Sequence, residues 1–134
     1  MSEAIKIKLR TRMSQVDAHY AGNLVDGARI LALFGDAATE VLIRHDGDEG
    51  LFRAYETVEF LAPVYAGDYL EVTATLKKVG NTSREIEFEA YKVIEAVLGA
   101  QHASAAQVLE KPLRVAQARG TCVVPLECQR IKRK

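Results

Sequence analysis

The sequence predicts an α+β fold in which an antiparallel sheet curls around one long helix. Two observations carry the prediction. A single apolar stretch with helical spacing occupies residues 24–44, and period-two alternation of apolar and polar residues recurs on both sides of it. Short turn-rich breaks join the later strands, as in an antiparallel meander. We expect one strand, one helix and four further strands in a single domain over residues 1–134.

The composition excludes several classes of protein. The chain has 134 residues, of which 49% are hydrophobic and 27% charged, as in ordinary globular proteins. Eighteen Lys and Arg residues balance 18 Asp and Glu residues, so no overall charge favours nucleic acid or an anionic membrane as a partner. The N-terminal residues contain no apolar run that could serve as a signal peptide, and no stretch is long enough to span a bilayer, so we expect neither a secreted nor a membrane-spanning protein. Its two cysteines lack the spacing of a zinc site, and we expect a cytoplasmic protein.

The first half of the chain supplies a strand and the helix. Residues 4–10 alternate three apolar with three cationic side chains, which predicts a strand with one buried face. Residues 13–23 are small or polar and have no sustained period. The helix over 24–44 is apolar on nearly every side, whereas one small sheet covers only one side of it. We therefore expect a homo-oligomer, a dimer or larger.

An acidic, glycine-rich turn at residues 45–50 separates the predicted helix from the strands that follow it. Residues 51–64 are rich in aromatic and β-branched side chains, which predicts a strand. Gly67 and Asp68 predict a turn. Residues 69–77 then give the clearest period-two run in the chain.

The last third of the chain predicts two more strands. A turn at Gly80-Asn81 leads into a strand over 84–97. The alanine-rich residues 100–109 fit either a short helix or a loop. Residues 113–126 are predicted to form a long strand that is bent or bulged at Gly120. The basic tail from about 129 to 134 is predicted to be frayed.

The order of these elements resembles the hot-dog fold, whose members mostly act on acyl-CoA thioesters. Four segments resemble hot-dog acyl-CoA hydrolases: residues 19–27 (HYAGNLVDG), 59–64 (EFLAPV), 67–68 (GD) and 79–83 (VGNTS). The chain departs from the hydrolases at two points. His19 stands where they usually carry a catalytic Asn or Asp, and Asp26-Gly27 where they carry paired glycines.

A closer resemblance is to the 3-aminobutyryl-CoA ammonia-lyases of lysine fermentation. It is carried by residues 17–20 (DAHY), 34–36 (FGD), 47–54 (GDEGLFRA), 88–94 (FEAYKVI) and 120–125 (GTCVVP). The resemblance implies reversible deamination of 3-aminobutyryl-CoA to crotonyl-CoA and ammonia. The alternatives are a hot-dog acyl-CoA thioesterase and a non-catalytic acyl-CoA binding module.

The elimination needs a base for the α-proton, donors for the enolate oxygen and a group that holds the ammonium. Asp17 and His19 precede the helix, and in an extended segment both side chains point to one side. They are candidates for proton transfer. The alternative is that Asp17 caps a turn in a polar loop.

The start of the helix and its second half supply the other candidates. The N–H groups of Gly22, Asn23 and Leu24 would face the thioester carbonyl if the helix begins there, although a capped turn explains the same residues. Asp36 and Glu40 lie one turn apart on an apolar helix, where burial would raise the pKa of a carboxyl group. The alternative is that the carboxylates of Asp36 and Glu40 lie at the surface, where they are solvated or paired with nearby arginines.

The resemblance to hot-dog proteins implies that the turn carrying Asn81, Thr82, Ser83 and Arg84 contacts the pantetheine or the phosphates of coenzyme A, and we expect these four residues to bind it. The alternative is a plain polar hairpin turn. The acidic turn at 45–50 lacks the ligand spacing of a calcium loop, so we expect no metal. We expect no cofactor other than the coenzyme A of the substrate.

Overall fold

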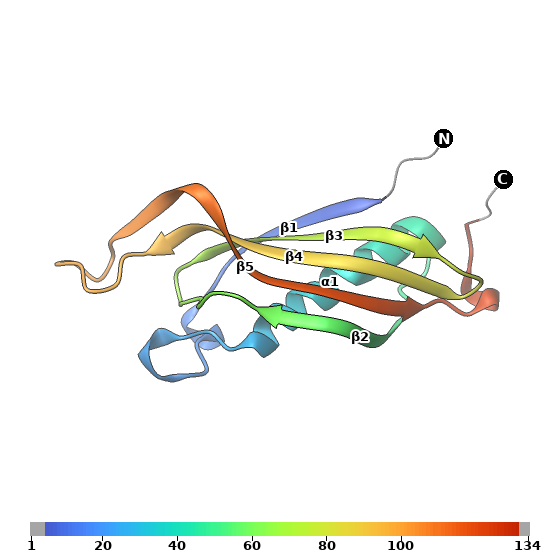
Figure 1. Ribbon diagram of the computed structural model, residues 1–134, viewed down its shortest axis with the longest axis horizontal. Helices are drawn as coiled ribbons and strands as arrows, with labels where there is room; N and C mark the ends of the chain where they lie inside the picture. The colour runs from blue at the N-terminus through green and yellow to red at the C-terminus, as the bar shows by residue number, and fades with distance from the viewer. Residues whose placement is uncertain (1–4, 132–134) are drawn as a thin grey trace.

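The computed structural model describes residues 5–131. Five strands and one long helix follow one another as β1 (Lys6–Arg12), α1 (Gly27–Asp46), β2 (Leu51–Phe60), β3 (Tyr69–Val79), β4 (Ser83–Ala96) and β5 (Ala106–Val123). The strands form one antiparallel sheet in the order β1-β3-β4-β5-β2. Helix α1 crosses one face of this sheet (Figure 1). The predicted α+β hot-dog architecture is confirmed.

The core lies between α1 and the inner face of the sheet. Helical spacing places Ile30, Phe34, Ala37 and Val41 on the sheet side of α1, where each is buried. The ring of Phe34 stacks on that of Phe88 from β4, with the ring centroids 5.0 Å apart. None of the helices among the described residues is long and apolar enough to cross a membrane.

Helix α1 begins three residues later than predicted. Leu24 and Val25 are held in extended backbone, because Leu24 forms a β-bridge with Tyr65 and the Val25 N–H donates to the Val64 carbonyl at 2.8 Å. Only after Asp26 can the chain turn into the helix. The outer side of α1, at Ala28 and other small or polar residues, remains exposed in the single chain.

Strand β2 departs from period two because it contains two bulges. The register with β5 shifts once after Phe52 and again after Tyr55. The half-buried side chains are therefore spaced by three, at Phe52, Tyr55 and Val58. The extra residues lie on β2, so the bulge predicted at Gly120 is misplaced. Gly120 instead admits the Phe52 ring, which would lie 2.6 Å from a Cβ at that position.

The alanine-rich segment after β4 forms no helix among the described residues. Ala106 pairs with Ala96, and Val108 with Ile94, so residues 106–109 belong to β5. Strand pairing has overridden the helix propensity of alanine here. The two strands form a long hairpin that projects beyond the body of the sheet (Figure 1).

The start of the basic tail is tied down and is not frayed as predicted. The N–H groups of Arg130 and Ile131 donate to the Asp46 carbonyl, at 2.8 and 3.2 Å. The Gln129 side chain donates to the carbonyls of Asn81 and Val124. The rest of the predicted tail, residues 132–134, and Ala4 of the first predicted strand lie outside the described residues.

Candidate functional site

A shallow apolar pocket of about 370 Å³ lies at the N-terminal end of α1. One wall comes from the segment that enters the helix and from its first turn, and the other from the end of β2 and the residues that follow it. The nine lining residues are Leu24, Val25, Gly27, Ile30, Phe60, Leu61, Ala62, Pro63 and Val64. The pocket is thus suited to a small hydrocarbon group.

A buried ion pair positions the second wall of this pocket. Lys92 Nζ lies 3.1 Å from a carboxylate oxygen of Asp68, and both side chains are almost completely buried. Lys92 also donates to the Pro63 carbonyl at 3.0 Å, and Asp68 accepts from the N–H of Tyr65. Because both charges are paired and hydrogen-bonded, the segment around Pro63 is fixed against the sheet.

The backbone at the start of α1 offers donors beside the pocket. Among the described residues, no acceptor meets the N–H groups of Gly27 and Ala28. Such free N–H groups, together with the helix dipole, favour negative charge. An oxygen that gains negative charge at this end of the helix would therefore be stabilised.

Gly22, Asn23 and Leu24, predicted as these donors, precede the helix. Gly22 and Asn23 have positive φ angles in the 3₁₀ turn Ala21–Asn23, where both are exposed. The Asn23 carbonyl accepts from Ala66 and the Leu24 carbonyl from Tyr20. These residues form a compact turn, and the helix N-terminus that they were expected to provide lies at Gly27.

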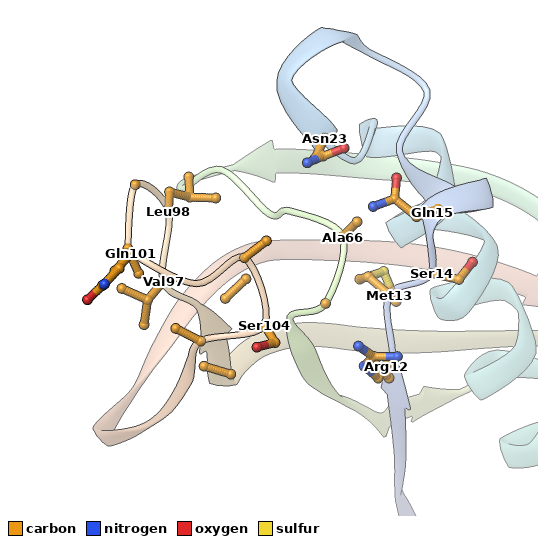
Figure 2. A pocket seen from close by; sticks show the side chains of 17 residues that line it. Arg12, Met13, Ser14, Gln15, Asn23, Ala66, Val97, Leu98, Gln101 and Ser104 are labelled. Atoms are coloured by element: carbon orange, nitrogen blue, oxygen red, sulfur yellow. The ribbon is translucent and has the colours of Figure 1, made fainter.

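A larger pocket of about 630 Å³ lies between the N-terminal loop and the β4–β5 hairpin. In Figure 2, Arg12, Ser14 and Gln15 stand on one side, and Gln101 and Ser104 of the hairpin on the other. Most of the remaining lining consists of glycine, alanine and backbone. Arg12 is the one cationic residue in the lining of this pocket. The pocket is therefore a poor match for a group with several phosphates.

Asp17 and His19 do not pair through their side chains. Asp17 Oδ1 lies 2.9 Å from Arg29 Nε of α1, in an ion pair that lacks hydrogen-bond alignment. Asp17 Oδ2 accepts from both the N–H and the hydroxyl of Ser14. His19 is exposed and contacts Tyr20 edge to face. Asp17 thus fastens the loop to the helix, as in the turn-capping alternative.

Asp36 and Glu40 lie apart from the pocket within one chain. At 1.5 Å of rise per residue, Glu40 is about 20 Å along α1 from Gly27. Glu40 forms an i,i+4 ion pair of 2.8 Å with Arg44, and Asp36 is exposed. Neither carboxyl group is buried, so the desolvation expected from an all-apolar helix is absent from the single chain.

The predicted coenzyme A turn, between β3 and β4, lies at the opposite end of the sheet from the N-terminus of α1 (Figure 1), and the pocket is at that N-terminus. Asn81 and Ser83 are exposed there, and Thr82 is half-buried. Arg84, by contrast, is 2% exposed, and its guanidinium donates to both carboxylate oxygens of Asp46 at 2.8 and 2.9 Å. It also donates to the Gly80 and Ser83 carbonyls. Arg84 joins the turn to the end of α1.

Sequence reasoning missed Phe60, the aromatic residue of the pocket. The string EFLAPV contributed to the resemblance as a whole, but nothing in the alternation of β2 marks Phe60 as a site residue. Its partner Gly27 stood out only as half of an Asp-Gly pair in place of two glycines. Within residues 5–131, no group of three or more His, Cys, Asp or Glu side chains could hold a metal ion.

Comparison with known proteins identifies the family. The model of the thioesterase superfamily matches residues 22–97, and the chain belongs to that superfamily. It is 59% identical over 126 residues to 3-aminobutyryl-CoA ammonia lyase from Acetoanaerobium sticklandii, a match that covers 94% of this chain and 99% of that protein.

Solved structures share the fold of this chain. β-Alanyl-CoA:ammonia lyase from Clostridium propionicum superimposes with a TM-score of 0.92 at 39% identity, over 98% of this chain and 92% of that one. A hexameric thioesterase from Yersinia pestis is similar in fold, with a TM-score of 0.71 at 17% identity over 98% of this chain and 94% of that one.

Proposed function

We propose that this protein is an ammonia-lyase that interconverts 3-aminobutyryl-CoA with crotonyl-CoA and ammonia in lysine fermentation. The observation that carries the proposal is the 59% identity over nearly the whole chain to a relative named for that substrate. The apolar pocket at the start of α1 supports it, because its size and lining suit a short acyl chain.

The reaction asks for little beyond acid–base chemistry at a thioester. A base takes the proton from the α-carbon, and the electron pair of that bond forms the new C=C bond. The C–N bond breaks, and its electron pair leaves with the nitrogen of the protonated amine as ammonia. The thioester carbonyl carries negative charge during this step. We therefore propose no cofactor besides the coenzyme A of the substrate.

The N–H groups of Gly27 and Ala28 are the proposed donors to the thioester carbonyl. They replace Gly22, Asn23 and Leu24 in that role, because they are the first free donors of the helix. His19 is the proposed proton carrier, since it is exposed on the loop before the helix and an imidazole can both accept and donate a proton. Asp17 positions this loop through Arg29 and Ser14.

A second copy of the chain would complete the site. Strand β2 is a ten-residue edge strand with exposed apolar residues at both ends: Leu51 is 69% and Phe60 52% exposed. We propose a homo-oligomer in which β2 pairs with its own copy about a two-fold axis. Such an axis reverses direction along β2, so the turn at Asn81, Thr82 and Ser83 of one copy lies beside the helix N-terminus of the other. That turn can then meet the coenzyme A.

The proposed place of action is the cytoplasm. Cys122 and Cys128 are both free thiols, and Cys122 is buried in the core. Unpaired cysteines are usual for proteins of a reducing compartment.

Mass spectrometry of the purified protein with crotonyl-CoA and ammonium tests the proposal. The thioesters and free coenzyme A are followed separately, at mildly alkaline pH. We expect a species with the mass of crotonyl-CoA plus ammonia and no rise in free coenzyme A. Release of free coenzyme A without this adduct would make the protein a hot-dog acyl-CoA thioesterase, the alternative given by the sequence. No change in either would indicate a binding module.

A further inference from the structure

The Phe60 ring occupies the space where a side chain at position 27 would stand. A Cβ atom added to Gly27 would lie 2.6, 2.8 and 3.0 Å from three atoms of that ring. Cβ atoms in proteins essentially never come within 3.0 Å of a heavy atom from a residue that is distant along the chain. The glycine therefore permits the last side chain of β2 to rest directly on the first turn of α1.

This contact lies at the edge of the apolar pocket. Phe60 and Gly27 both line it, one from each wall, so their contact closes the pocket on one side. The other side is limited by Val64, which is buried and fixed through the Val25 N–H. In the single chain Phe60 is 52% exposed, so truncation can remove this wall without emptying the core.

We propose that Phe60, seated on Gly27, determines the length of the acyl chain that the pocket accepts. The inference rests on the proposed function, because it assigns the acyl group of the thioester to this pocket. With the ring in place the pocket is bounded at Phe60. Without it, the chain can extend into the space that the ring vacates. Apolar pockets discriminate by roughly 10- to 200-fold per methylene group, which makes the effect measurable.

The test compares two thioesters in the direction of ammonia addition, crotonyl-CoA and trans-2-hexenoyl-CoA. We expect Phe60→Ala to raise the ratio of kcat/KM for the six-carbon over the four-carbon substrate by at least about tenfold, and Phe60→Trp to lower it. Leu126→Ala is the matched control, because Leu126 is a 65% exposed apolar residue that does not line the pocket. It should leave the ratio unchanged. Size-exclusion chromatography verifies that each variant keeps the oligomeric state.

A double-mutant cycle tests the contact from the helix side. Gly27→Ala keeps the N–H donor but places a methyl group against the ring, so kcat/KM for crotonyl-CoA should fall by about tenfold or more. In the Phe60→Ala background the same change should cost less than about threefold, because the clash is gone. Thermal unfolding of the four proteins shows whether each is folded under assay conditions.

The outcomes separate this inference from the proposed function. If the unsubstituted protein adds ammonia to crotonyl-CoA but neither Phe60 variant moves the ratio, the inference is wrong and the proposed function stands. The inference would also be overturned if Gly27→Ala lowered kcat/KM for crotonyl-CoA by the same factor in the unsubstituted protein and in the Phe60→Ala variant. If the unsubstituted protein adds ammonia to neither thioester, the proposed function falls, and this inference with it.

Discussion

Removing the carboxylate of Asp46, which forms a buried ion pair with Arg84, should destabilise the fold far more than removing the carboxylate of Glu40 from its exposed ion pair with Arg44. Asp46 and Arg84 meet through two hydrogen bonds of 2.8 and 2.9 Å, and their side chains are only 3% and 2% exposed. Asp46→Ala would leave the guanidinium buried without a counter-charge. Breaking a buried pair in this way costs about 3–5 kcal/mol. We expect that loss in the free energy of unfolding.

The exposed pair Glu40–Arg44 is the control, since its atoms are also 2.8 Å apart. Glu40→Ala should cost about 0.5 kcal/mol or less, because solvent screens an exposed i,i+4 pair. The double variant Asp46→Ala/Arg84→Met should recover much of the loss, since it removes the stranded charge as well. About 1–2 kcal/mol should remain lost, because the Gly80 and Ser83 carbonyls lose their donor.

Urea unfolding followed by circular dichroism, at one fixed protein concentration, measures all four proteins. A loss below about 1 kcal/mol for Asp46→Ala would refute the assignment of Arg84 to a buried pair. So would a double variant that is no more stable than Asp46→Ala. Either result would reopen the prediction that Arg84 is available to coenzyme A.

Three further predictions concern other parts of the chain. Burial, with a smaller effect of Glu56, raises the pKa of the Cys122 thiol from 9.0 to about 11. Since the unfolded thiol ionises first, the free energy of unfolding should fall between pH 9 and 11, and the fall should be larger by on the order of 2 kcal/mol than in a Cys122→Ala variant, where the raised pKa of Tyr55 still contributes. Gly120→Ala places a Cβ 2.6 Å from the Phe52 ring, so the free energy of unfolding measured in urea should fall by about 1–3 kcal/mol. An unchanged free energy of unfolding would contradict the packing of Phe52 on Gly120. Asp17 positions the loop through Arg29, so Asp17→Asn should lower kcat and leave the pH at which activity is half-maximal nearly unchanged. A pH–activity profile displaced by this substitution would make Asp17 a proton carrier instead.

The sequence alone was sufficient to predict the order of the elements, because alternation and helical spacing are local signals. The clean period two of β3 and the apolar stretch of α1 come from burial of one face of each. The signal failed in β2, where two bulges convert the spacing from two to three. It failed again after β4, because pairing of Ala106 with Ala96 depends on a partner strand.

The site was harder to predict, because its geometry depends on contacts between distant segments. Leu24 lies outside the helix since it bridges Tyr65, and nothing in its own neighbourhood indicates that. Arg84 follows a polar turn, as a phosphate ligand would, yet Asp46, 38 residues earlier in the chain, holds it in the core. Pairing of Asp17 with Arg29 likewise follows from how the loop folds back on α1.

Ammonia addition in heavy water tests the lyase proposal most directly. Crotonyl-CoA and ¹⁵N-labelled ammonium are incubated with the protein in D₂O, and the thioester is returned to H₂O before mass spectrometry. An α-proton base and a β-nitrogen nucleophile require an adduct that carries one ¹⁵N and one deuterium on the α-carbon, with free coenzyme A unchanged. Coenzyme A release with crotonate as the other product, and no labelled adduct, would contradict the proposal.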